Sequence, residues 1–349
     1  MRELHVMTDL QFGSCGKGLF AGYLARRVEP DAIAINWAPN AGHSYIDEAG
    51  RLFVNIALPN GIVAPSVRRV LMGPGSVINP QILMSEIERY ADVLDDIQIM
   101  IHEHAAVVQE YHRGQEAEYA HKIGSTMKGV GAAINQKITR DPDHSNVARD
   151  VLKGTPLEGY LVSVEDYNRA LDISSVVMIE GAQGFSLSIN QGFYPYTTSR
   201  DCTVSQLLTD CAIPGSVFGP LFKMKVYGVA RTYPIRVANR FDKATGKQIG
   251  WSGPHYFDQK EIEWADIGME PELTTVTRLP RRIFTFSEEQ IRQAVRMNGT
   301  DEVFLNFCNY DQTANGRTIG EIIDVIERAG AEVRWLGNGP AVQDIVEVA

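Results

Sequence analysis

The chain has 349 residues, 44% hydrophobic and 22% charged, a composition typical of a globular enzyme with an ample core. Its net charge of −10 argues against a general nucleic-acid or membrane surface, and no apolar run resembles a membrane span or a signal peptide. The four cysteines lack Cys-x-x-Cys spacing, so we expect no zinc site or disulfide framework and a cytoplasmic protein. We expect one domain over residues 1–349, with a mobile loop excursion outside the core around residues 242–264.

The first predicted elements are a strand over residues 4–7, a glycine-rich turn over residues 11–18 and a helix over residues 19–28. Such a turn can bind a phosphate, because its N–H groups and the helix dipole point at the anion and Lys17 adds a positive charge. It is not a Walker A loop, since Gln11 and Gly18 stand where that motif needs a glycine and a Ser or Thr. Glycine-rich turns also join strands to helices for structural reasons alone, and that interpretation stays open for this stretch.

Strand-like and helical segments then alternate, which predicts an α/β fold with a central, mainly parallel sheet flanked by helices. Asn79 followed by Pro80 begins a predicted helix whose apolar stripe continues to Leu94. Ser287 and Thr318 each begin a helix in a capping-box pattern. Further strands are predicted over residues 32–37, 70–72, 97–101, 175–179 and 302–307.

Four short segments occur in an order that resembles the adenylosuccinate synthetase family, whose members join aspartate to C6 of a purine nucleotide. The segments read QFGSCGKG at residues 11–18, NAGH at 40–43, EGAQG at 180–184 and YPYTT at 194–198. The matches run from about Thr8 to Arg282, so the resemblance covers most of the chain. It implies the family's P-loop-related α/β fold.

The turn at residues 13–16 reads Gly-Ser-Cys-Gly where the family has Gly-Asp-Glu-Gly. This departure is similar to the phage branch of the family, which uses ATP to join aspartate to dGMP, giving N6-succino-2-amino-2′-deoxyadenylate. Ser14 is smaller than Asp and leaves room for the 2-amino group of guanine, but its hydroxyl is both a poor base and a poor Mg²⁺ ligand compared with the family's carboxylate. A water or the substrate aspartate are alternatives for the missing base. An ordinary enzyme that uses IMP and GTP, or a nucleotide-binding protein without catalysis, are the alternative functions.

The resemblance implies that Ser14, Lys17, His43 and Gln183 are catalytic, and that Ser14 and the carbonyl of Gly42 hold Mg²⁺. The implied triphosphate-binding residues are Gly13, Ser14, Cys15, Gly16, Lys17, Gly18, Gly42, His43, Ser44, Asn306, Asn309, Gly337 and Gly339. Asn309 stands where the family has an Asp that recognises guanine. Its amide offers both a donor and an acceptor, which suits adenine and predicts ATP or dATP as the co-substrate. A strand-end Asn that only caps the turn is the structural alternative.

For dGMP the resemblance implies Ser14, Asn40, Ser125, Thr126, Arg140, Gln183 and Thr198. Arg140 corresponds to an arginine that completes the neighbouring subunit's phosphate site, which implies a homodimer. Without this correspondence, Arg140 would be interpreted as a charged, solvent-exposed residue in a loop. For L-aspartate the implied residues are Thr274, Thr275, Val276, Thr277 and Arg281, because arginine suits a carboxylate. Leu279 takes the place of an arginine that reaches the ribose in the family, which agrees with a deoxyribonucleotide.

Overall fold

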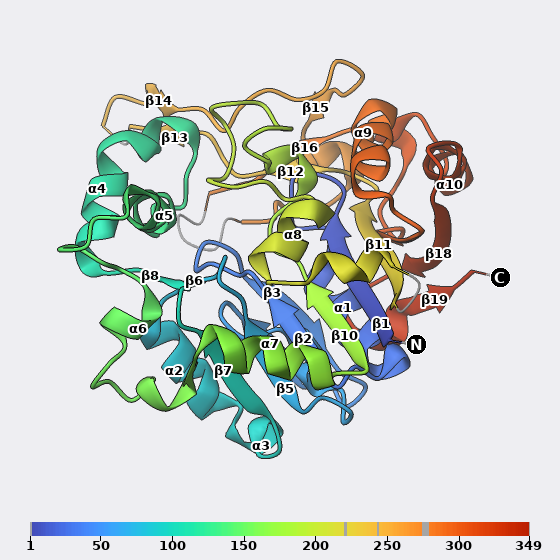
Figure 1. Ribbon diagram of the computed structural model, residues 1–349. Coiled ribbons are helices and arrows are strands. Elements are labelled where there is room, and N and C mark those ends of the chain that lie inside the picture. The colour runs from blue at the N-terminus through green and yellow to red at the C-terminus, as the bar shows by residue number, and fades with distance from the viewer. Residues whose placement is uncertain (1, 220–221, 243, 274–278, 349) are drawn as a thin grey trace.

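The structure, a computed structural model, describes residues 2–219, 222–242, 244–273 and 279–348. In this part of the chain the centre is a ten-stranded sheet (Figure 1) whose neighbouring strands are parallel except for one pair at an edge. From that edge the strands are β19 (Ile345–Glu347), β18 (Glu332–Gly337), β17 (Glu302–Asn306), β11 (Phe222–Arg231), β1 (Arg2–Asp9), β10 (Val176–Glu180), β2 (Ala32–Ile35), β5 (Arg69–Met72), β7 (Gln98–His102) and β9 (Leu161–Val162). The predicted α/β class and mainly parallel sheet are confirmed.

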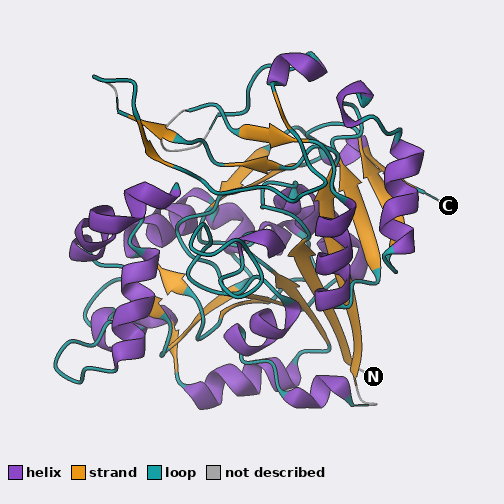
Figure 2. Ribbon diagram, turned by 90° about the horizontal axis from the view of Figure 1, so that it is seen from above, coloured by secondary structure: helices purple, strands orange, loops and turns teal. Residues whose placement is uncertain are grey.

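Helices cover both faces of the sheet (Figure 2), because successive side chains of a buried strand point to opposite faces. Ile33 and Ile35 of β2 pack in the cluster that includes α1 and α2, whereas Ala32 and Ala34 pack in the cluster that includes α7 and α8. A third cluster joins α9 and α10 to β17 and β18. The helices are α1 (Lys17–Val28), α2 (Pro80–Arg89), α3 (Ala91–Leu94), α4 (Glu110–Ala120), α5 (Val130–Thr139), α6 (Ala148–Val151), α7 (Val164–Ile173), α8 (Val204–Asp210), α9 (Glu288–Asn298) and α10 (Ile319–Arg328).

The predicted starts of three helices agree with the structure, but the predicted length of one helix does not. Asn79 caps α2 with its side chain, and Thr318 and the residue three positions on form a complete capping box. The helix predicted to run to Leu94 is interrupted at Tyr90, so that α2 and α3 are separate. Ser287 caps α9, but the side chain of Gln290 donates to Ser186 instead of completing a capping box.

Short paired strands lie beside the main sheet. They are β12 (Ile235–Arg236), β16 (Arg282–Phe284) and β15 (Glu261–Ile262) in one antiparallel sheet, and the pairs β13 (Arg240–Phe241) with β14 (Gln248–Gly250), β3 (His43–Ile46) with β4 (Leu52–Asn55), and β6 (Val77–Ile78) with β8 (Ala106–Val107). The expectation that the segment around 242–264 lies outside the core is wrong for its second half. There Ser252, Tyr256 and Gln259 are buried, and Tyr256 hydrogen-bonds Ser186. Aromatic and amide side chains make this segment packed structure, although its composition resembles that of a loop.

No helix among the described residues is long and apolar enough to cross a bilayer.

Candidate active site

The candidate site lies at the carboxyl ends of five neighbouring parallel strands, β17, β11, β1, β10 and β2. Loops that follow parallel strands meet at one edge of the sheet, where ligands of open α/β sheets bind. Here they border a cavity of about 530 Å³. The predicted site residues that line it are Gly13, Ser14, Gly16, Lys17, Gly18, Asn40, Gly42, His43, Ser44, Ser125, Thr126, Gln183, Thr198 and Arg281.

The glycine-rich turn wraps around the buried carboxylate of Asp9, the last residue of β1. The backbone N–H groups of Gln11, Gly13 and Cys15 donate to this carboxylate at 2.9, 3.1 and 3.3 Å, and the Lys17 ammonium lies 3.1 Å from it. Asp9 therefore holds the turn in shape and pairs with the charge of Lys17. The sequence analysis missed Asp9, although an acid between a strand and a glycine-rich turn was visible there.

His43 begins β3, where a loop was expected, and its ring is held by two neighbours. It stacks on Trp37 with ring centroids 4.0 Å apart, and its Nδ1 lies 3.7 Å from Oε1 of Glu180. Burial, with a smaller effect of the Lys17 charge, lowers the pKa of His43 well below its usual value, so the imidazole is neutral at neutral pH. Burial raises the pKa of Glu180 to about 8, so this carboxyl is mostly protonated at neutral pH. A neutral imidazole beside a neutral acid can donate or accept a hydrogen bond without burying a charge.

Two site residues adopt a left-handed backbone conformation that side chains disfavour. Ser14 has φ 58° and Gln183 has φ 64°. The amide of Gln183 donates to Oδ1 of Asn40 at 3.1 Å, which links the loops after β10 and β2. Such conformations cost of order 1 kcal/mol each and concentrate at functional sites. The backbone therefore directs Ser14 and Gln183 towards the same cavity.

The cavity is rich in positive charge although the protein is acidic. Lys128, Arg236, Arg240 and Arg281 line it together with Lys17, and Glu116 supplies the one carboxylate among its described lining residues. Arg236 is 3% exposed and donates to three backbone carbonyl oxygens, and burial lowers its pKa to about 9. Arg236 and Arg240 were not identified from the sequence, where no motif marks them. Their charge favours anionic ligands.

The residues predicted for the base of the triphosphate lie outside the lining of this cavity. The amide of Asn306 donates to the carbonyl oxygen of Cys15 and accepts from the backbone of Phe307, so its visible role is to brace the glycine-rich turn. Gly337 packs against Asn306, and Gly339 packs against Asp344. Asn309 is exposed in the turn after β17, and its role in adenine recognition stays a prediction. Phe307, the residue after β17, has φ 62° and does line the cavity.

Arg140 and most of the residues predicted to bind aspartate are not among the described residues that line the cavity. Arg140 is exposed at the end of α5 and does not line the cavity, so its action on a neighbouring subunit stays a prediction. The residues Thr274, Thr275, Val276 and Thr277, predicted to bind aspartate, lie outside the described residues, whereas Arg281 lines the cavity.

Comparisons with known proteins agree with this arrangement. The family model described as adenylosuccinate synthetase matches residues 6–149 and 154–320. Two phage proteins named N6-succino-2-amino-2′-deoxyadenylate synthase are similar, one from Acinetobacter phage SH-Ab 15497 (44% identical, 99% of this chain, 93% of the relative) and one from Salmonella phage PMBT28 (46%, 99% and 97%). A solved structure of the cyanophage S-2L succinoaminodeoxyadenylate synthetase, bound to dGMP and dATP as an energy donor, is 41% identical with a TM-score of 0.89, and the match covers 99% of this chain and 95% of that one. The chain therefore belongs to the adenylosuccinate synthetase family.

Proposed function

We propose that this chain is a ligase that joins L-aspartate to C6 of dGMP at the expense of ATP or dATP, giving N6-succino-2-amino-2′-deoxyadenylate, the nucleoside diphosphate and phosphate. The observation that carries the proposal is that Ser14, His43, Gln183 and Arg281 line one cationic cavity, with a serine at the place of the family's acid. The phage relatives that carry the corresponding name support it.

In the first step the O6 of guanine attacks the γ-phosphorus of the triphosphate. An O6–phosphorus bond forms, the bond to the diphosphate breaks, and the N1 proton passes to water or to the substrate aspartate, because the Ser14 hydroxyl is a poor base. Lys17, at the N-terminus of α1, stabilises the transferring charge, and the neutral imidazole of His43 can donate a hydrogen bond to it. Because His43 is buried and stacked on Trp37, its ring needs little reorganisation at that moment.

In the second step the amine of aspartate attacks C6. The carbon–nitrogen bond forms, the C6–O6 bond breaks, phosphate leaves, and the amine loses its proton. Arg281 offers a planar guanidinium to a carboxylate of aspartate, and Gln183 offers an amide towards the purine. Both side chains line the same cavity as Ser14, which a reaction between two bound substrates requires.

The donor set suits Mg²⁺ held mainly by substrate. The described residues contain no group of three or more His, Cys, Asp or Glu side chains placed to hold a metal. Mg²⁺ at phosphates is usually bound through one or two protein oxygens and the phosphates themselves, and the carbonyl of Gly42 and the hydroxyl of Ser14 are such oxygens. When bound there, the ion would neutralise charge on the transferring phosphoryl group.

We also propose a homodimer in which Arg140 reaches the dGMP phosphate of the neighbouring subunit. Its support is the resemblance and the exposed position of Arg140 at the end of α5.

The test is to incubate the purified chain with aspartate, Mg²⁺, dGMP or IMP, and ATP or GTP, and to identify the products by mass spectrometry. We expect the succinylated product from dGMP with ATP, and its loss in a His43→Asn control. A product from IMP with GTP would instead make the chain an ordinary adenylosuccinate synthetase. Nucleotide binding without any product would make it a non-catalytic binder.

A further inference from the structure

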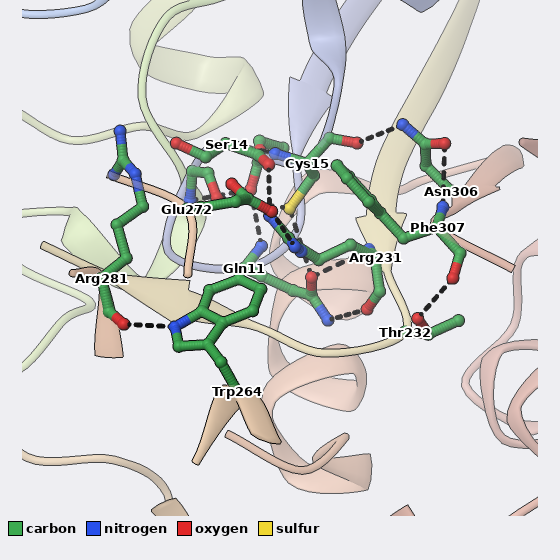
Figure 3. A network of polar contacts seen from close by, with 12 residues as sticks. Gln11, Ser14, Cys15, Arg231, Thr232, Trp264, Glu272, Arg281, Asn306 and Phe307 are labelled. Carbon is green, nitrogen blue, oxygen red and sulfur yellow. Dashed lines mark hydrogen bonds and ion pairs between the residues drawn. The ribbon is translucent and has the colours of Figure 1, made fainter. Parts of the chain in front are cut away.

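Arg231, the last residue of β11, is 0% exposed, and its guanidinium contacts three separate segments (Figure 3). Its Nη1 donates to the carbonyl oxygen of Ser14 at 3.1 Å, and its Nη2 lies 2.6 Å from Oε1 of Glu272. Its Cζ lies 3.8 Å from the centroid of the Phe307 ring. One buried cation therefore contacts the glycine-rich turn at Ser14, Phe307 just after β17, and Glu272.

The backbone of Arg231 is attached to the same turn. Its N–H donates to Oε1 of Gln11 at 2.9 Å, and its carbonyl oxygen accepts from Nε2 of Gln11 at 3.0 Å. Because the backbone N–H and carbonyl groups of Arg231 both bind Gln11, the guanidinium keeps a constant position relative to Ser14. Any residue that pairs with Arg231 is thereby placed relative to the phosphate-binding turn.

Glu272, which pairs with Arg231, also binds the backbone of Arg281. The carbonyl oxygen of Glu272 accepts from the backbone N–H of Arg281 at 2.8 Å, and Leu273 and Pro280 form an antiparallel bridge between them. The carbonyl oxygen of Arg281 in turn accepts from the indole of Trp264 at 2.7 Å (Figure 3). The side chain of Arg281 lines the cavity.

We infer that the Arg231–Glu272 ion pair is a positioning device that sets the guanidinium of Arg281 at a defined place relative to Ser14 and the phosphate-binding turn. It rests on the proposed function, in which Arg281 receives a carboxylate of aspartate while the turn holds the phosphoryl group. A fully buried guanidinium is costly unless it is paired, and the acid that pairs with it here is 31% exposed. The interaction that pairs the charge of Arg231 thus also fixes Glu272, whose carbonyl oxygen accepts from the backbone N–H of Arg281.

The test is the kinetics of Glu272→Gln in the full-length chain, with the exposed neighbour variant Glu270→Gln as the matched control. Glutamine keeps the shape and the backbone contact to Arg281 but loses the charge that pairs with Arg231. We expect the KM for aspartate to rise at least tenfold, while the KM for dGMP stays near the wild-type value; the melting temperature falls, because the buried guanidinium loses its charged partner. Glu270→Gln should leave all three unchanged. Arg231→Lys, which keeps the charge without the planar fork, should raise the KM for both aspartate and dGMP because it also loses Ser14.

The outcomes separate the two proposals. If wild-type chain makes no succinylated product from dGMP, the proposed function fails and the inference fails with it. If wild-type chain is active and neither Glu272→Gln nor Glu272→Ala changes the KM for aspartate, the inference alone is overturned. Equal rises in the KM values for aspartate and dGMP in Glu272→Gln would also overturn it, because they indicate a general structural role.

Discussion

Gly184 lies so close to the glycine-rich turn that a single added methyl group should disturb the site. Gly184 follows Gln183, and its backbone dihedrals, φ −129° and ψ 151°, are open to any residue. A Cβ at this position would lie 2.5 Å from the carbonyl oxygen of Gln11 and 2.7 Å from the carbonyl carbon of Phe12, with the nitrogen of Gly13 closer still. These are backbone atoms of the glycine-rich turn, so no side-chain rotation can relieve the contact.

Gly184→Ala must therefore push the turn and the Gln183 loop apart by about 1 Å to reach ordinary contact distances. Overpacking of this kind costs about 1–3 kcal/mol, which lowers the melting temperature of a protein of this size by roughly 1–4 °C. A displacement of about 1 Å between reacting groups can cost about 100-fold in rate. We accordingly expect kcat for the dGMP reaction to fall by about that factor.

The assay combines thermal melting with steady-state kinetics, and Gly159→Ala is the control. No heavy atom lies within 4 Å of a Cβ built at Gly159, so this variant adds the same methyl group at no contact cost. A Gly184→Ala protein with wild-type melting temperature and wild-type kcat would refute the reasoning. It would mean that the two loops are not held in contact.

Four other predictions follow from named residues. Ser14→Asp should lower turnover of dGMP, since a larger anion enters the space for the 2-amino group at a cost of about 1–3 kcal/mol; equal or higher activity would remove size as the reason for serine. Arg140→Ala should raise the KM for dGMP, and mixing it with Lys17→Ala should restore activity through one intact composite site; no complementation after verified subunit exchange would contradict the shared site. Wild-type chain should prefer ATP or dATP, and Asn309→Asp should shift its preference towards GTP, since a mismatched polar pair costs about 1–3 kcal/mol; a wild-type preference for GTP would disprove the assignment. Because burial raises the pKa of Glu180 from 4.5 to about 8, its contribution to stability is complete below about pH 4.5 and is lost as the pH rises to about 8, at about 1.4 kcal/mol per pH unit. In denaturant titrations from pH 5 to 8.5, Glu180→Gln should reduce the fall in the free energy of unfolding with pH. Parallel plots of unfolding free energy against pH for wild type and Glu180→Gln would exclude a raised pKa of Glu180 as the cause.

The sequence alone determined the features that depend on contiguous residues. The strand, turn and helix around Lys17 and the capped starts of α2 and α10 were readable, because apolar spacing and capping residues act within a few positions. The ordered motifs also identified the family and the unusual Ser14. The interruption at Tyr90 was not readable, since the apolar stripe continues across it.

Only the tertiary structure decided which distant residues complete the site. Glu180 lies beside His43, and Arg231 joins Ser14 to Glu272, because the strand order places β11, β1, β10 and β2 side by side with their carboxyl ends at one edge. These contacts connect residues that are about 40 to more than 200 positions apart in the chain. Local periodicity carries no information about such pairs, whereas the pairing of buried strands specifies them.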